Sequence, residues 1–239
     1  MEPALGPQVH RAIFTPQWSH ISDPKSLMQG LKRWLLSRGV EVIKGEVRDI
    51  VSGSSSPLSV KLGDGHPLAT DRAVVAAGAW SSNLARLLGD PVLLESERGY
   101  NTTLPTPGVV VDRELIFAER KFVATPLRCG LRIGGAAEFG GLSAAPNFKR
   151  SETLVELARR YLPELHTDGR TNWAGHRPTT PDSLPVIGTS SCQAHIFYAF
   201  GHGHLGLTQA ATTGRLVSEL VFQKPSSIDM SPYRIERFA

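Results

Sequence analysis

The chain has 239 residues, of which 41% are hydrophobic and 20% charged, and its formal net charge is +4. This composition is typical of a globular protein with one large domain or two small ones. The basic residues are scattered rather than gathered in a block with aromatics, which argues against nucleic acid as the main partner. The spacing of Cys129 and Cys192 fits neither a disulfide framework nor a zinc site. We therefore expect a reducing compartment.

The hydropathy pattern argues against a membrane-embedded protein. The first residues lack the basic and then apolar segments of a signal peptide, and no apolar run approaches the ~18 residues that cross a bilayer. We expect a cytoplasmic protein, or one that is at most peripheral at the inner face of the bacterial membrane.

The first predicted element is an amphipathic helix that starts after Asp23. Asp23 can cap it, Pro24 suits the first helical position, and Gly39 can end it. Short β-runs follow, and the residues from 73 to 80 are apolar throughout, which is typical of a strand buried on both faces. Strands are predicted in this half at 40–43, 46–51, 58–62 and 71–78.

From residue 91 the pattern changes to apolar stretches separated by proline and glycine, which favours antiparallel strands. The alternation of helices and strands predicts a mixed α/β fold. The elements predicted in this half are strands at 108–112, 121–127, 131–135 and 195–200, helices at 151–162 and 207–222, and an extended tail.

A glycine-rich turn follows the strand predicted at 195–200. Gly201, Gly203 and Gly206 are spaced as G-x-G-x-x-G. A dinucleotide-binding loop of this form opens a βαβ unit with an acidic residue about 20 positions later, but here one helix and a Pro/Ser-rich tail follow. Two other interpretations remain open: a tight strand-to-helix turn, or a helix amino terminus that faces an electron-rich group.

The segment 173–188 places an arginine among prolines. Arg177 is followed by Pro178, Pro181 and Pro185, which restrict the backbone and can hold a guanidinium in one pose. A guanidinium matches a carboxylate with two parallel hydrogen bonds. The alternative is an ordinary surface arginine in a proline-rich loop.

His202 and His204 allow a metal interpretation, since two residues this far apart share one face of a strand. Zinc needs at least a third protein ligand, and none is evident nearby. We therefore expect these histidines to make hydrogen bonds rather than to bind a metal.

Four segments together resemble the carboxy-terminal part of FAD-dependent D-amino-acid dehydrogenases. These enzymes belong to the superfamily of D-amino-acid oxidase and glycine oxidase, and the likeness runs from about Pro3 to Phe238. The stretch "ERGY" at 97–100 and the closing "YRIERF" are most similar to the D-hydroxyproline dehydrogenase branch. The segments are "ERKFVATPL", "RIGGAAEFGGL", "GHRPTTPDSLPVIG" and "FYAFGHGHLGLTQAATTGRLVSEL".

The resemblance carries an expectation about the domains. The superfamily's own G-x-G-x-x-G loop, which binds the FAD pyrophosphate, has no counterpart between Met1 and Asp90, so the chain resembles a fragment or a truncated gene product. We expect 21–90 and 171–239 to form the remnant of a Rossmann-like FAD-binding domain. Residues 1–20 and 91–170 would form a mostly antiparallel substrate domain.

The resemblance also implies roles for particular residues. Arg177 would hold the substrate carboxylate, and Tyr100 would be a second substrate contact or, equally, a core tyrosine. Val47 would lie near the adenine of FAD. The residues implied near the flavin ring are Ala77, Gly78, Trp80, Gly201, His202, Gly203, His204, Leu205, Gly206, Leu207 and Thr208.

The implied reaction is hydride transfer from Cα of a D-amino acid to flavin N5, followed by hydrolysis of the imine or its retention in a ring. Positioning of the substrate is the main requirement, so no catalytic residue is assigned. The partners implied are a D-amino acid and a second copy of the chain or other dehydrogenase subunits, because an incomplete sheet leaves apolar surface exposed. Two alternatives remain: a non-catalytic fragment or subunit that does not hold FAD by itself, and a small nicotinamide-binding oxidoreductase.

Overall fold

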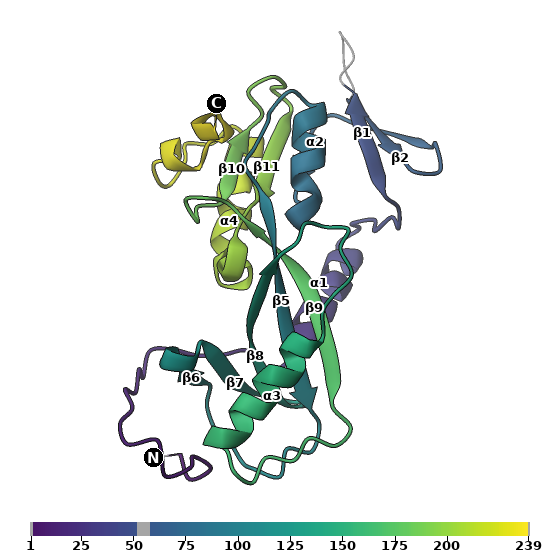
Figure 1. The fold of residues 1–239 in the computed structure, drawn as a ribbon. Coiled ribbons are helices and arrows are strands. Elements are labelled where there is room, and N and C mark those ends of the chain that lie inside the picture. Colours follow the sequence, from purple (N-terminus) through teal and green to yellow (C-terminus); the bar gives the residue numbers. More distant parts are fainter. Residues whose placement is uncertain (1, 52–57, 239) are drawn as a thin grey trace. The chain divides into compact units, whose positions relative to one another are not determined.

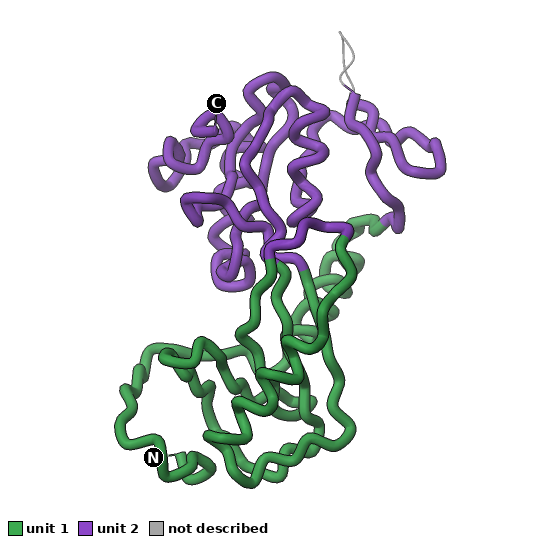
Figure 2. The backbone as a smooth tube through the Cα atoms, viewed as in Figure 1, with its two compact units in different colours: residues 1–42, 98–138, 144–175 green, residues 43–97, 139–143, 176–239 purple. Residues whose placement is uncertain are grey.

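The computed structural model describes residues 2–51 and 58–238. They form two compact units (Figure 2). Each unit has a hydrophobic core of its own. The first unit comprises Met1–Val42, Arg98–Glu138 and Ala144–Gly175, and the second comprises Ile43–Glu97, Phe139–Ser143 and His176–Ala239.

The first unit is built on antiparallel strands and a helix (Figure 1). β7 (Phe122–Leu127) lies between β6 (Leu115–Phe117) and β8 (Gly130–Phe139) and pairs antiparallel with both. Helix α3 (Lys149–Tyr161) packs its apolar side onto these strands, because Leu154 and Ala158 share one core with Phe122 and Ile133. The remaining elements of this unit are α1 (Pro24–Ser37) and η2 (Ala118–Arg120).

The second unit contains two three-stranded sheets and two helices. β1 (Val47–Val51), β2 (Leu58–Leu62) and β3 (Pro67–Thr70) form one antiparallel sheet. In the other sheet, β11 (Ile196–Phe200) pairs antiparallel with β10 (Val186–Thr189) and parallel with β4 (Ala73–Val75). Helix α4 (Gly206–Val221) packs against β10 and β11. The other elements are α2 (Ser81–Leu87) and the short turns η1 (Gly78–Trp80), η3 (Gly203–Leu205), η4 (Ser231–Tyr233) and η5 (Ile235–Phe238).

Two long strands belong to both units. β5 (Glu95–Leu104) and β9 (Thr171–Thr179) are neighbours in a sheet of order β6-β7-β8-β5-β9. The boundary between the units crosses β5 after Glu97 and β9 after Gly175. One end of each strand, 95–97 and 176–179, therefore lies in the second unit.

The mixed α/β class with antiparallel sheets is confirmed, as are the three long helices. The cap of α1 is also as predicted, because Asp23 accepts a hydrogen bond from the backbone N–H of Ser26 at 2.9 Å and Gly39 takes a φ of 82°.

Three local predictions are wrong. The segments 40–43 and 108–112 form no strand, and the tail contains two 3₁₀ turns instead of extended chain. Val40, Val42 and Ile43 are exposed and pair with no strand in the part of the chain that the structure describes, and the N–H of Val40 donates instead to the C=O of Leu35. A β-prone segment needs such a partner for its backbone hydrogen bonds.

Within residues 2–51 and 58–238, no helix is both long and apolar enough to traverse a bilayer. Cys129 and Cys192 are both free and exposed. The predicted roles of the two domains stay a prediction.

Candidate functional site

The sheet topology brings the two predicted cofactor segments to one edge of a sheet. β4 and β11 run parallel, with Ala73 opposite Ile196 and Val75 opposite Tyr198. β4 leads into the turn 77–80, and β11 leads into the turn 201–208. Because the carboxyl ends of neighbouring parallel strands emerge at the same edge, where ligands of α/β proteins bind, the two turns form one candidate site.

The glycines of these turns adopt backbone angles that other residues rarely take. Gly78, Gly201 and Gly203 have φ values of 56°, 84° and 50°. A Cβ on Gly78 would meet no atom within 4 Å, and one on Gly203 would lie 3.7 Å from its nearest neighbour, Oγ1 of Thr179. The three glycines thus allow left-handed backbone angles, and Gly78 and Gly203 leave space beside the turn, whereas a Cβ on Gly201 would lie 3.1 Å from Cγ2 of Thr180.

The G-x-G-x-x-G sequence does not open a βαβ unit. Among the described residues, α4 is followed by the turns η4 and η5 and by no strand. This arrangement argues against a dinucleotide fingerprint, which needs the second strand, and leaves the two other interpretations of the turn.

The surface at this edge is partly apolar and carries the positive end of a helix dipole. The amino terminus of α4 has no side-chain cap and no acidic residue in its first turn, so its N–H groups and positive dipole end are not neutralised by a side chain. Trp80, Leu205 and Leu207 expose about half of their surfaces, and a bound ring would cover such apolar area. An open hollow of about 350 Å³ lies beside His202 and Gly206.

A polar cluster of the second unit joins the predicted substrate residue to this turn. The carboxylate of Glu97, on β5, is only 8% exposed. Its Oε1 lies 3.4 Å from Nη1 of Arg177, on β9, and 2.8 Å from Nε2 of His204. Its Oε2 accepts a hydrogen bond from Oγ1 of Thr179 at 3.2 Å.

Arg177 is half-buried and keeps unused hydrogen-bond donors. Its side chain is 29% exposed, and Glu97 is its only ion-pair partner among the described residues. Burial lowers the pKa of this guanidinium, and the charge of Glu97 acts in the opposite direction. An arginine nevertheless stays charged at physiological pH, so Nη2 and Nε can still donate to a ligand carboxylate.

The sequence suggested an irregular proline-rich loop around Arg177. The structure instead places Arg177 in the regular strand β9. The position of its guanidinium depends on β9, on Glu97 and on an isolated bridge between Thr179 and His202. Residues 177 and 179 share one face because strand side chains alternate, which explains why both reach Glu97.

The two histidines of the turn have different partners. Nε2 of His202 forms a hydrogen bond with Oγ1 of Thr213 at 2.9 Å, whereas His204 reaches Glu97. Burial lowers the pKa of His202, which favours its neutral form. Nε2 of each histidine is thus engaged in a contact within the protein.

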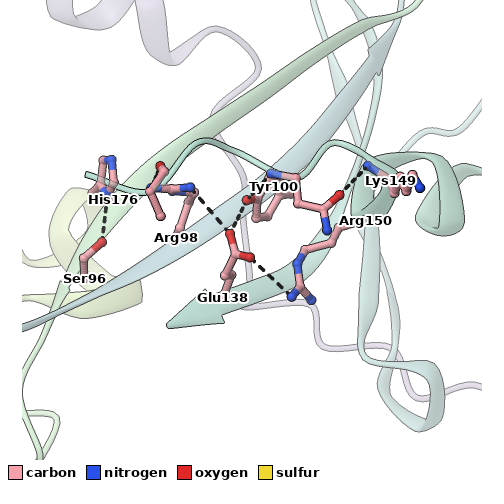
Figure 3. A network of polar contacts seen from close by, with 9 residues as sticks. Ser96, Arg98, Tyr100, Glu138, Lys149, Arg150 and His176 are labelled. Carbon is pink, nitrogen blue, oxygen red and sulfur yellow. Dashed lines mark hydrogen bonds and ion pairs between the residues drawn. The ribbon is translucent and has the colours of Figure 1, made fainter. Parts of the chain in front are cut away.

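Trp80 lies against a histidine that sequence analysis did not single out. Its ring packs edge-on against that of His176, with the centroids 5.4 Å apart. His176 also shares a hydrogen bond of 2.6 Å with Oγ of Ser96 (Figure 3). Trp80 is 52% exposed despite this contact, so one side of its ring is available to a ligand.

Tyr100 lies in the interior of the first unit and is 1% exposed. Its hydroxyl donates to Oε2 of Glu138 and accepts from the backbone N–H of Asn147 at 2.9 Å. Arg98 and Arg150 lie 3.5 Å and 3.4 Å from the same carboxylate (Figure 3). These contacts favour the alternative of a core tyrosine, and its role as a substrate contact stays a prediction.

Val47 lies apart from the other predicted cofactor residues in the topology. It begins β1, in the antiparallel sheet, and pairs with Leu62. Helix α2, which follows the turn 77–80, contacts β1. A role near the adenine of FAD stays a prediction.

Glu97 was not identified as a site residue from the sequence. In the sequence it is only the first residue of "ERGY", and the neighbouring residues do not indicate which side chains it contacts. The signal comes from the structure alone, because the sequence predicts no strand at 95–104: Glu97 is an acidic side chain inside a buried strand, and Glu is rarely buried without a partner.

Comparison with known proteins now defines the class. Residues 1–220 match the model of the DAO family, described as "FAD dependent oxidoreductase". The chain therefore belongs to this family, whose members are FAD-dependent. The assignment agrees with the resemblance found in the sequence.

Among named relatives, the chain is 35% identical to a D-amino-acid oxidase of Bradyrhizobium diazoefficiens, over 99% of this chain and 57% of that protein. It is 31% identical to a D-amino acid dehydrogenase of Paramagnetospirillum magneticum, over 100% of this chain and 57% of that protein. The chain thus spans a little over half the length of these curated relatives.

Solved structures support the fold. The structure of glycine oxidase from Geobacillus kaustophilus superposes with a TM-score of 0.78 at 24% identity, over 89% of this chain and 58% of that one. Iminodiacetate oxidase from Chelativorans sp. gives 0.76 at 20% identity, over 87% and 57%. At these identities the likeness concerns the fold alone.

Proposed function

We propose that the protein oxidises D-amino acids with FAD as its cofactor, and that Arg177 binds the α-carboxylate of the substrate. The names of the two curated relatives support the substrate class. The main observation behind the proposal is the environment of Arg177. Its side chain is half-buried, has one ion-pair partner among the described residues, and is linked through that partner, Glu97, to the turn 201–208.

FAD, when bound, supplies the acceptor for the hydride that leaves Cα of the substrate. The residues proposed to hold it are Val47, those of the turn 77–80 and those of the turn 201–208. The N–H groups at the start of α4 favour negative charge by about 0.3–1 kcal/mol at an exposed site, and the glycines allow close approach. Arg177 orients the substrate by its carboxylate, and correct orientation is the largest requirement of such a reaction.

The first experiment compares Arg177→Met with Arg72→Met, an exposed arginine of the same unit. Loss of a bidentate, charge-assisted contact should weaken D-amino acid binding and raise KM by about 10- to 100-fold. The control should bind as the unchanged protein does. Equal affinity of the Arg177→Met protein would remove Arg177 from this role.

Two measurements test the wider proposal. The purified protein is incubated with FAD and freed of unbound FAD by gel filtration, and its visible absorption spectrum should then show flavin bands that bleach when a D-amino acid is added without oxygen. A protein that stays colourless and unreduced would instead support a non-catalytic fragment or subunit.

Within this substrate class, we propose hydroxy-D-proline as the preferred substrate. The proposal rests on the similarity of "ERGY" and "YRIERF" to the D-hydroxyproline dehydrogenase branch. A panel of D-amino acids that includes 4-hydroxy-D-proline should show the highest kcat/KM for that compound, and a clear preference for an acyclic side chain would contradict it.

A further inference from the structure

Glu97 places a negative charge directly beside the proposed carboxylate anchor. Arg177 and His204 contact one carboxylate oxygen, and Thr179 contacts the other. A carboxylate can accept about four hydrogen bonds. Since three are in place, Glu97 retains the capacity for one more donor.

The spacing of the two charges matches that of an α-amino acid. Nη1 of Arg177 and Oε1 of Glu97 are 3.4 Å apart. The amine and the carboxylate of the substrate are attached to the same carbon atom. A substrate whose carboxylate meets the guanidinium therefore keeps its amine within reach of the neighbouring carboxylate.

We propose that Glu97 is a specificity-determining residue that accepts a hydrogen bond from the α-amino group of the substrate. This inference rests on the function proposed for Arg177. Glu97 would thereby make the site prefer amino acids over carboxylic acids that lack the amine. Such acids include the keto acids formed by oxidation and hydrolysis.

The charge balance gives the physical reason for the distinction. Arg177 and Glu97 together carry no net charge, so an amino acid zwitterion adds none to the half-buried site. A carboxylic acid without an amine adds a negative charge beside Glu97, and like charges repel more strongly where water is partly excluded. The keto acid product is thus held less tightly than the substrate, which helps its release.

The test measures affinities by isothermal titration calorimetry, on the protein without FAD so that no ligand is oxidised, for two matched pairs: D-alanine with propionate, and D-proline with cyclopentanecarboxylate. All titrations are made in the same buffer at about pH 8. The unchanged protein should bind at least one amino acid about tenfold or more tightly than its partner acid.

Glu97→Gln preserves the shape of the side chain and removes its charge. It should weaken amino acid binding by about 10- to 100-fold, as for loss of a hydrogen bond to a charged group, and should strengthen binding of the partner acid. Arg177→Met should weaken both ligands. Glu95→Gln, an exposed position on the same strand, is the matched control and should change neither affinity.

The outcomes separate this inference from the proposed function. If Glu97→Gln weakens both ligands equally, Glu97 only positions Arg177, and the inference is overturned. It is also overturned if Glu97→Gln changes neither affinity. If the unchanged protein binds the amino acids tightly but Arg177→Met does not weaken them, the carboxylate anchor itself is wrong.

A second variant covers the case in which Glu97→Gln fails to fold. Glu97→Asp retains the charge on a shorter side chain. It should keep the repulsion of propionate and cyclopentanecarboxylate while it loses part of the affinity for the amino acid. A gain in affinity for those two acids would contradict the inference.

Discussion

Two carboxylates of the second unit, Asp90 and Glu97, are nearly equally buried but are satisfied in different ways. Asp90 is 3% exposed and Glu97 is 8% exposed. Asp90 accepts hydrogen bonds from the hydroxyls of Ser190, Ser191 and Tyr198 and from the backbone N–H of Ser191. Glu97 instead contacts a guanidinium, a histidine and one hydroxyl.

This difference separates a structural network from a binding site. Burial alone would raise the pKa of Asp90, but the hydrogen bonds from Ser190, Ser191 and Tyr198 outweigh it and lower the pKa. All of these donors are neutral. The cluster around Glu97 contains a cation that is partly exposed and has donors to spare, so it can still interact with a ligand.

The largest expected effect is the loss of the closed network. Asp90→Ala leaves the hydroxyls of the buried Ser190 and Tyr198, and the hydroxyl and N–H of Ser191, without their acceptor, and it should reduce the free energy of unfolding by about 2–4 kcal/mol. Urea denaturation against Asp71→Ala, an exposed aspartate of the same unit, measures this. Equal stability of the two variants would show that the Asp90 contacts are not structural.

A smaller effect is expected at Tyr100, where the comparison is extended to the first unit. Tyr100→Phe removes the hydroxyl from Glu138 and leaves the N–H of Asn147 unpaired, so it should cost about 1–2 kcal/mol of unfolding free energy. If the tyrosine belongs to the core, D-amino acid affinity should stay within about twofold. A tenfold loss of affinity would establish Tyr100 as a substrate contact instead.

The smallest expected effect is on the pH dependence of stability, through His202 in the turn 201–208. Burial lowers the pKa of His202 in the folded protein, so the unfolded chain takes up a proton at this histidine more readily. The stability that the neutral His202 contributes is therefore present above the pKa of the unfolded chain, about 6.5, and is lost as the pH falls below that pKa. Solvent screens a half-buried group, and we expect about 0.5 kcal/mol or less.

Free energies of unfolding measured between about pH 8 and pH 5 should therefore decline less steeply for His202→Asn than for the unchanged protein. His195→Asn, an exposed histidine of the same unit, should keep the original slope. A steeper decline for His202→Asn would reverse the assigned direction.

Local signals in the sequence were sufficient for the helices and the glycine turn. Asp23, Pro24 and Gly39 act within a few residues of one another, and so do Gly201 and Gly203. The same rules were wrong at 40–43, because strand formation depends on a partner that the local sequence does not contain.

The family could likewise be recognised from short motifs, since each motif is read within itself. The association of Glu97 with Arg177 could not, because it joins residues 80 positions apart through the pairing of two strands. Tertiary structure also decided that the hydroxyl of Tyr100 meets Glu138 and that α1 buries none of its residues. Residue types and spacing thus determined the long helices and the glycine turn, whereas long-range packing decided which strands pair, which charges meet and which donors remain available.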